Sequence, residues 1–227
     1  MQHVELRREI IRTCQRMNAL RLNQGTSGNI GVRIGDRYLL TPSGMDYDAM
    51  APVDIVLMGF DGSYAGRRIP STEWRFHRDI LRRRPEVDVV IHTHARFCTT
   101  LAIHGRAIPA IHYMVAVAGG TDIRCAPYVT PTTQALSDVA LAALEGRRAC
   151  LLAHHGVIVI GESLSSTLAL LVEVENLAEQ YWRALQIGAP PILSEAQMAG
   201  VFEIMRTYGR QPDPELRPEP GLAADAS

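Results

Sequence analysis

Three histidines are the residues of this sequence whose types and spacing could most clearly support chemistry. His92 and His94 are separated by one residue in the segment IHTH. Alternate residues of a β-strand point to the same side of the sheet, so the two rings can face one point. His155, in the segment AHHG, can complete a facial set of imidazoles. Three neutral imidazoles leave one coordination position open, which is typical of a catalytic zinc site.

Two alternatives to this interpretation stay open at the level of the sequence. A histidine pair of the type HxH on a strand is more often surface or hydrogen-bonded than metal-binding. His154 could also replace its neighbour as the third ligand, although the glycine that follows His155 favours His155. The other histidines have no partner at ligand spacing, and His3 and His77 are expected on the surface or on a helix face.

Glu73 stands at the start of a helix that we expect over residues 73–83, directly after the segment PST. A carboxylate at this position can simply favour the positive end of the helix. It can also act as a general base beside a metal ion. Ser71 or Thr72 is expected to cap the helix, and hydroxyls with free N–H groups at a helix N-terminus also bind phosphate.

Two further loops carry the same kind of polar group. The segments GTSGN (25–29) and TPSG (41–44) combine glycines, hydroxyls and an amide, and neither contains a basic residue. Each segment alone is only a turn. Three such segments around one possible metal site are better explained by a shared anion, so we expect a phosphate pocket.

The composition is that of an ordinary globular protein. Apolar residues make up 47% of the 227 residues, charged residues make up 21%, and the formal net charge is -1. This balance indicates neither a nucleic-acid surface nor a membrane surface, and no apolar run is long enough to span a bilayer. The N-terminus does not resemble a secretory signal. The four cysteines are scattered along the sequence with no close pair. We therefore expect a cytoplasmic protein with reduced thiols.

The elements that must position these residues alternate between helical and strand patterns. We expect one α/β domain over residues 1–209, with a mostly antiparallel or mixed sheet covered by helices, and a disordered polar tail over residues 210–227. The hydrophobic spacing of Leu6, Ile10, Cys14 and Met17 predicts an N-terminal helix. Further helices are expected at 73–83, 97–103, 134–145, 164–186 and 194–208, and strands at 30–34, 38–40, 55–58, 87–94, 108–117 and on both sides of a turn within 149–160.

Seven motifs, in unbroken order, resemble one known family. They are LNQGTSGN (22–29), LLTPSG (39–44), IPSTEWRFH (69–77), VIHTHA (90–95), IPAIHYMVAVAGG (108–120), CAPY (125–128) and LLAHHG (151–156). Together they resemble the class II L-fuculose-phosphate aldolase group of the aldolase class II, ribulose-phosphate 4-epimerase and adducin-head family. The resemblance runs from the first helix to about Tyr208.

The resemblance implies a fold, an assembly and a set of site residues. The fold would be an α/β/α sandwich, and the protein a homotetramer with active sites at subunit interfaces and one Zn²⁺ per subunit. His92, His94 and His155 would bind the ion, joined in the resting state by Glu73, which would then act as the base. Tyr113 would reach in from a neighbouring subunit as the proton donor. The substrate and its phosphate would be held by Thr26, Gly28, Asn29, Ser43, Gly44, Ser71, Thr72 and Tyr208.

The resemblance also implies the reaction. A ketose 1-phosphate would be cleaved reversibly to dihydroxyacetone phosphate and a small aldehyde, with Zn²⁺ acting as a Lewis acid. The sequence contains no lysine, which excludes the alternative aldolase mechanism through a Schiff base. The default substrate is L-fuculose 1-phosphate, which yields L-lactaldehyde.

Departures from the family pattern leave other substrates open. Pro131 stands where fuculose aldolases carry an aromatic residue on the aldehyde side, which makes 5-deoxyribulose 1-phosphate and 5-(methylthio)ribulose 1-phosphate competing substrates. A sugar-phosphate 4-epimerase is a weaker alternative, because epimerases resemble this chain with aspartate in place of Glu73. A non-catalytic module like the adducin head is weaker still, because such domains lack the metal ligands.

Overall fold

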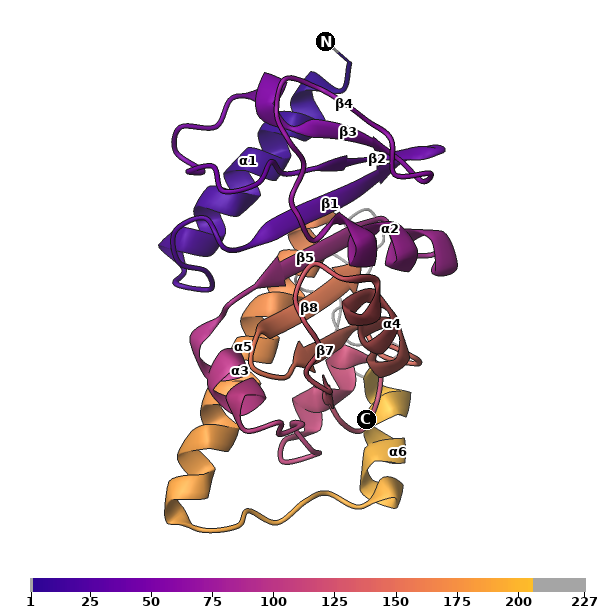
Figure 1. The fold of residues 1–227 in the computed structure, drawn as a ribbon. Coiled ribbons are helices and arrows are strands. Elements are labelled where there is room, and N and C mark those ends of the chain that lie inside the picture. Colours follow the sequence, from indigo (N-terminus) through magenta and orange to yellow (C-terminus); the bar gives the residue numbers. More distant parts are fainter. Residues whose placement is uncertain (1, 206–227) are drawn as a thin grey trace, which may run out of the picture.

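The computed structural model describes residues 2–205, which form one α/β/α sandwich built on a single mixed sheet (Figure 1). The strand order is β4-β3-β2-β1-β5-β8-β7-β6, and all neighbouring strands are antiparallel except β6 and β7. The predicted fold class is therefore confirmed. The strands are β1 Asn29–Ile34, β2 Arg37–Leu40, β3 Val56–Gly59, β4 Tyr64–Ala65, β5 Val89–Thr93, β6 Arg124–Ala126, β7 Ala149–Leu152 and β8 Gly156–Gly161.

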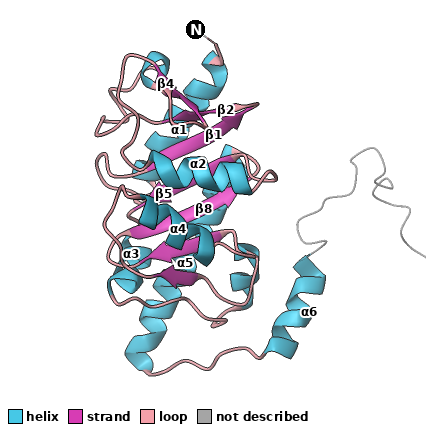
Figure 2. Cartoon of the chain, turned by 45° about the vertical axis from the view of Figure 1, so that its right-hand side comes forward, coloured by secondary structure: helices cyan, strands magenta, loops and turns pink. Residues whose placement is uncertain are grey.

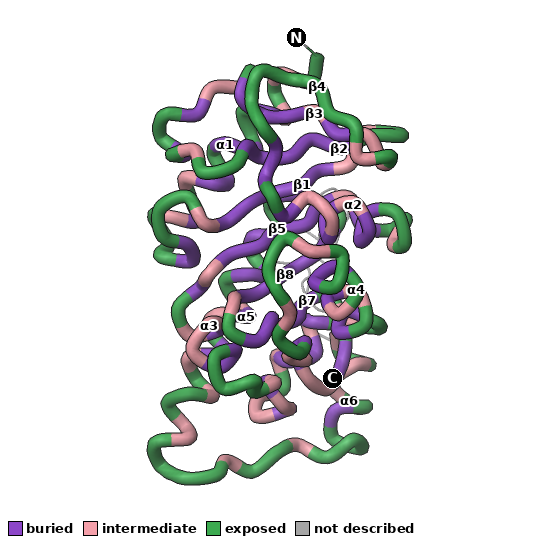
Figure 3. The backbone as a smooth tube through the Cα atoms, in the orientation of Figure 1, coloured by how far each residue is buried: buried purple, intermediate pink, exposed green. Residues whose placement is uncertain are grey.

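Helices cover both faces of the sheet (Figure 2). Buried apolar residues of α1, α3 and α5 pack against one face, and those of α2 and α4 pack against the other. The central strands between these layers are buried along most of their length (Figure 3). The helices are α1 Val4–Ala19, α2 Trp74–Arg83, α3 Arg96–Ile103, α4 Gln134–Ala143, α5 Leu164–Ile187 and α6 Glu195–Met205, with short 3₁₀ turns η1 Pro52–Asp54 and η2 Tyr113–Ala118.

The two central strands explain why the middle of the sequence is so apolar. All residues of β5 and all residues of β8 are buried, because each strand has a sheet neighbour on both sides and helices on both faces. Such strands read as near-continuous hydrophobic runs. A polar residue within β5 therefore needs a specific partner, and His92 is such a residue.

The strand predicted over residues 108–117 is wrong. The structure has only an isolated bridge between Ile108 and Ile123, followed by the 3₁₀ turn η2. The buried apolar residues of η2 pack against α5 and α6 rather than in a sheet. Burial without strand pairing produces the same apolar pattern.

Other local differences are smaller. Strands β4 and β6 were not expected, because they contain two and three residues respectively. The N-cap of α2 is Glu73, and not Ser71 or Thr72 as predicted, while the Ser71 Oγ accepts a hydrogen bond from the Glu73 backbone N–H at 3.3 Å. Tyr208 and the predicted tail at 210–227 lie outside the described residues.

The helix α6 lies to one side of the sandwich, after an exposed connection from the end of α5 (Figures 2 and 3). Its buried residue Met198 packs against Ala110 and Ala116. Among residues 2–205, no helix combines the length and the apolar character that crossing a lipid bilayer requires.

Candidate metal centre and phosphate pocket

Strands β5 and β8 bring the three predicted histidines together. His92 is the penultimate residue of β5, His94 follows that strand, and His155 directly precedes β8, which pairs with β5. One nitrogen of each ring lies within 4.8 Å of those of the other two, and the ring centroids are 4.7 to 5.1 Å apart. This is the separation at which three imidazoles can share one metal ion.

His154 does not join this cluster. Its backbone adopts a left-handed conformation with φ 56° in the turn between β7 and β8, and its ring packs edge-on against Tyr128 at 5.8 Å. The structure therefore places His155, the residue favoured by the sequence, beside His92 and His94.

The environment of the cluster fits a divalent metal ion. The His92 Nδ1 lies 3.0 Å from the carbonyl oxygen of Val157, and donation to this carbonyl leaves the Nε2 lone pair free for a metal. The buried Nε2 atoms of His92 and His94 have no hydrogen-bond partner among the residues described. Burial lowers the pKa of His92 to about 4 and also lowers the pKa of His94. The rings are therefore neutral near pH 7, as metal binding requires.

Gly156 allows the two strands to meet at this point. A Cβ atom on this residue would lie 2.4 Å from the carbonyl oxygen of Thr93, 3.0 Å from the His94 ring and 3.2 Å from the His92 ring. Any side chain here would push the histidines apart. The glycine after His155 is thus required by close packing.

The Glu73 carboxylate completes the cluster from the start of α2. Its Oε2 lies 3.3 Å from the His92 Nε2, and its Oε1 lies 3.2 Å from the His155 Nε2. Burial alone would raise the pKa of Glu73, but the positive charge that the His92 ring acquires in acid, a hydrogen bond with the His155 ring and a hydrogen bond from Asn29 hold this pKa well below its usual value. The carboxylate is therefore ionised, and it can bind a cation or accept a proton.

The predicted phosphate segments line the same cavity as the glutamate and two of the histidines. The cavity has a volume of about 280 Å³. Its lining contains hydroxyls, an amide and glycines but no lysine or arginine from the described chain. The residues that line it are Thr26, Ser27, Gly28, Asn29, Pro42, Ser43, Gly44, Ser71, Thr72, Glu73, His94, Pro131, Thr132 and His155.

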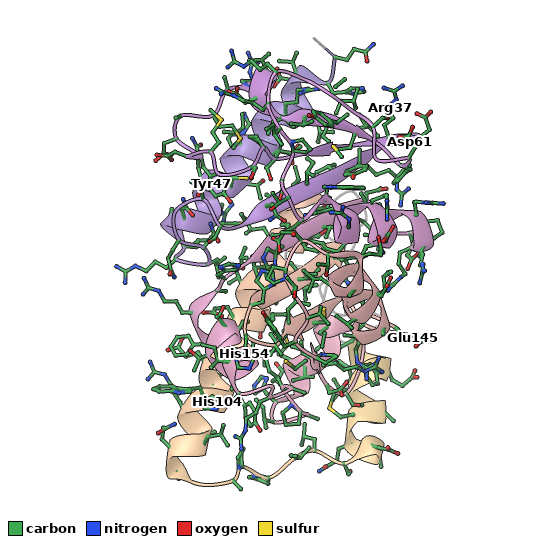
Figure 4. The ribbon with its side chains drawn as sticks, in the orientation of Figure 1. Arg37, Tyr47, Asp61, His104, Glu145 and His154 are labelled. Atoms are coloured by element: carbon green, nitrogen blue, oxygen red, sulfur yellow. The ribbon has the colours of Figure 1, made fainter. Side chains whose placement is uncertain are left out.

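A buried tyrosine supports one of these segments. Tyr47, labelled in Figure 4, lies beside α1, where its backbone carbonyl accepts a hydrogen bond from Gln15. Its hydroxyl donates to the carbonyl oxygen of Gly28 at 2.5 Å. This bond links the loop at 25–29 to the core, so the loop is held in place in the absence of a ligand.

One predicted site residue, Tyr113, does not line this cavity. Tyr113 lies on η2 with 45% of its surface exposed and its ring packed on His112 at 4.7 Å. It does not line the cavity of its own chain. Tyr208 lies outside the described residues.

His77 was expected on the surface or on a helix face. It lies on a face of α2 but not on the surface. The ring is completely buried, and its Nε2 lies 2.6 Å from the Asn29 Oδ1. The buried residues of α2 include Phe76, Ile80 and Leu81, so His77 belongs to the apolar stripe of this helix. The helical spacing of these apolar residues was the sequence pattern that could have predicted the burial of His77. Ser27, Pro42 and Thr132 were also absent from the predicted lining.

The fold and this cavity define a single-domain α/β enzyme with a candidate metal centre. Residues 8–182 match the sequence family described as the class II aldolase and adducin N-terminal domain. The chain belongs to this family.

Similar proteins indicate which enzymes of this family the chain resembles. The 5-methylthioribulose-1-phosphate/5-deoxyribulose-1-phosphate aldolase of Rhodospirillum rubrum is 54% identical over 206 residues, which cover 91% of this chain and 93% of that protein. The L-fuculose phosphate aldolase of Escherichia coli K12 is 45% identical over 210 residues, which cover 92% and 98%. A solved structure of an L-fuculose 1-phosphate aldolase superimposes with a TM-score of 0.87 at 35% identity, covering 91% and 98%. These relatives identify the chain as an aldolase of class II.

Proposed function

We propose that this chain is a zinc-dependent aldolase that reversibly cleaves a ketose 1-phosphate to dihydroxyacetone phosphate and a small aldehyde. The observation that carries the proposal is the convergence of three imidazoles, one ionised carboxylate and a set of neutral hydrogen-bond donors in one place. This combination can bind a phosphate at one end of a substrate and a metal-coordinated carbonyl at the other.

The preferred substrate is 5-(methylthio)ribulose 1-phosphate or 5-deoxyribulose 1-phosphate. The more similar of the two named relatives is called an aldolase of these compounds. Pro131 supports the same choice, because it lines the cavity without an aromatic ring. L-Fuculose 1-phosphate is the second candidate, supported by the relative at 45% identity.

The phosphate would be held by neutral groups. Ser43, Ser71 and Thr72 offer hydroxyls, and the backbone N–H groups of Gly44 and Thr72 make no hydrogen bond within the described residues. Hydroxyls and N–H groups at the positive end of a helix bind phosphate without a cationic side chain. The absence of an arginine from the described lining is therefore compatible with an anionic substrate.

His92, His94 and His155 would hold the Zn²⁺, with Glu73 as a further ligand in the resting state. The bound ion would supply the positive charge that stabilises negative charge developing on the dihydroxyacetone phosphate half. When the bond between C3 and C4 breaks, its electron pair stays on C3, and the C4 hydroxyl loses its proton as it becomes the aldehyde. Tyr113 would pass the proton of the C4 hydroxyl on to solvent, and Glu73, ionised at rest, would take up a proton from solvent and deliver it to C3.

Tyr113 would act on a neighbouring subunit of a homotetramer. Its exposed ring lies outside the cavity of its own chain, as expected for a residue that completes another site. Exposed apolar side chains on and after α5, together with one on α6, offer surface for such an assembly: Trp182, Ile187, Ile192 and Ile204. Large apolar residues of this kind are typical of surfaces that associate.

A substrate panel tests the proposal. The zinc-loaded protein would be incubated with the three ketose 1-phosphates, and dihydroxyacetone phosphate release would be measured with a coupled dehydrogenase. We expect the highest kcat/KM with the 5-deoxy and 5-methylthio compounds and a lower value with L-fuculose 1-phosphate. Release from none of the three would contradict the aldolase assignment, and a preference for L-fuculose 1-phosphate would contradict only the substrate assignment.

A further inference from the structure

A buried chain of hydrogen bonds stands behind the Glu73 carboxylate. The Asn29 Nδ2 donates to the Glu73 Oε2 at 2.9 Å, and the Asn29 Oδ1 lies 2.6 Å from the His77 Nε2. All three side chains are less than 10% exposed, and His77 is completely buried. These hydrogen bonds connect Asn29, the first residue of β1, to His77 in the first turn of α2, so the carboxylate is linked to both elements.

The chemistry of the three groups fixes the direction of each bond. An ionised carboxylate can only accept hydrogen bonds, so the Asn29 amide must present its NH₂ group to Glu73. Its carbonyl oxygen then faces His77, and the His77 Nε2 must be the donor. Burial and the His92 ring lower the pKa of His77 to about 3. The ring is therefore neutral near pH 7, with its hydrogen on Nε2.

The other side of the His77 ring supports this assignment. The Nδ1 is buried and has no hydrogen-bond partner among the residues described. It faces Gly31, where a Cβ atom would lie 2.5 Å from Nδ1 and 3.1 Å from the ring carbon Cγ. The ring occupies the space that a side chain at Gly31 would fill, so this position of β1 requires glycine when His77 is present.

We propose that His77 is a positioning residue that fixes the Asn29 amide and, through it, the Glu73 carboxylate for proton transfer. His77 does not line the cavity, and the metal cluster does not include it. Without a donor at this position, the amide can rotate and turn its oxygen toward the carboxylate, which removes the bond that orients Glu73. The inference rests on the proposed function, in which Glu73 is the base.

The direct test is the exchange of dihydroxyacetone phosphate hydrogen with solvent deuterium by the zinc-loaded protein, without aldehyde. This half-reaction reports on the base alone. We expect His77→Leu to slow exchange about tenfold or more, which corresponds to the loss of one charge-linked hydrogen bond. His77→Gln carries an amide that can donate from nearly the same place, and we expect it to restore the rate to within about threefold. Both variants are expected to bind as much zinc as the parent.

Ser137→Ala is the matched control. The Ser137 hydroxyl donates to Asp79 at 2.7 Å, so this change also removes a buried hydrogen bond to α2. It does so away from Asn29. We expect Ser137→Ala to lower the thermal midpoint as His77→Leu does while leaving deuterium exchange unchanged.

A double-mutant cycle separates positioning from a purely structural role. If His77 acts through Asn29, His77→Leu adds no further loss of exchange in an Asn29→Ala background. The same pair should also show coupling in urea unfolding of the metal-free protein, a measurement that needs no activity. Parental exchange in His77→Leu, or additive losses in the cycle, would overturn the proposal. A parent that neither exchanges hydrogen nor releases dihydroxyacetone phosphate would instead contradict the proposed function.

Discussion

The ionisation of Glu73 is determined by opposing effects of burial and of its polar neighbours. The residue is 8% exposed, and such burial normally favours the neutral acid. Two imidazoles within 3.3 Å and the Asn29 amide oppose this effect and keep the group ionised. The Asn29 amide donates to Oε2, and Oε1 faces the His155 ring at 3.2 Å, so the contacts of the two carboxylate oxygens differ.

Glu73→Gln should therefore retain the metal and lose proton transfer. We expect kcat to fall by about a hundredfold or more, as is common when a general base is removed, with the zinc content measured by atomic emission unchanged. Glu86→Gln is the control, because Glu86 is an exposed carboxylate that pairs with Arg84 on the surface. Parental activity in Glu73→Gln would rule out Glu73 as the base.

Gly31 affects both the stability of the protein and the position of the His77 ring. A methyl group there would lie 2.5 Å from the His77 ring, so Gly31→Ala must displace the ring or bend β1. We expect a loss of about 1–3 kcal/mol in unfolding free energy, typical of an overpacked core. Gly200→Ala on α6 meets nothing within 4 Å and should change stability by about 1 kcal/mol or less. Equal effects of the two changes in urea unfolding would contradict the assigned contact.

Much of the site could be predicted at this scale. The spacing of His92 and His94 and the glycine after His155 indicated the three rings that the structure gathers. The hydroxyl-rich loops were found because turn residues and anion-binding groups share a composition. His77 was expected on the surface or on a helix face, and its burial on the inner face of α2 was missed because its polar partner comes from a strand distant in the sequence. No local pattern shows that Asn29 faces this ring.

At the scale of elements, the turn before α4 is the unusual feature of the cavity. Thr132 lines the cavity with a backbone φ of 70°, a conformation that is strained for a β-branched residue. Strain of this kind persists where the surroundings enforce it, and it concentrates at functional sites. The Arg75 side chain on α2 donates to the Thr132 carbonyl oxygen at 2.8 Å. Helix α2 therefore carries both the Glu73 cap and the group that holds this wall.

Arg75→Ala should release the turn. We expect kcat/KM for the 5-methylthio substrate to fall about tenfold as the wall relaxes, by analogy with the loss of a charged hydrogen bond. Inhibition by dihydroxyacetone phosphate alone should remain at the parental value, since the loops proposed to hold its phosphate do not include this turn. Arg82→Ala is the control from the same helix. If Arg75→Ala also lost affinity for dihydroxyacetone phosphate, an effect of Arg75 on the Thr132 turn alone would be contradicted.

How well a helix or strand could be predicted from the sequence depends on its length and periodicity. Long segments with clear periodicity, such as α1 and α5, were assigned within a few residues. The segment 108–117 was assigned as a strand because its apolar residues are buried, yet η2 buries them against α5 and α6. The strands β4 and β6 are too short to carry a period. Their positions follow from pairing with β3 and β7.

At the scale of the molecule, the sheet explains why distant motifs meet. The order β1-β5-β8 places Asn29 opposite His92, and His92 opposite Ile158. The cavity therefore collects residues from 26 to 155. The mixed sheet could be predicted from the interleaved patterns. The strand order could not, because the contacts that determine it are long-range and leave no local signature.

The proposed assembly makes a quantitative prediction. If Glu73 of one subunit and Tyr113 of its neighbour act in one site, then neither Glu73→Gln nor Tyr113→Phe alone can be fully active. Random hybrids of the two variants would contain some sites with both parental residues. For equal mixing in a closed ring, about a quarter of the sites would be intact. Co-refolded mixtures should therefore regain about a quarter of parental kcat, and no recovery would contradict the shared site.

The central claim is that one metal ion, held by His92, His94 and His155, performs the aldol cleavage. The neighbouring histidines 154 and 155 allow the most direct measurement, because only His155 lies in the cluster. Bound zinc per chain and dihydroxyacetone phosphate release would be measured together in His155→Ala and His154→Ala, before and after chelation and zinc return. We predict one ion and reversible, zinc-dependent activity in the parent and in His154→Ala, and the loss of both in His155→Ala. Full activity with no bound metal, or a His155→Ala variant that keeps both, would contradict the account.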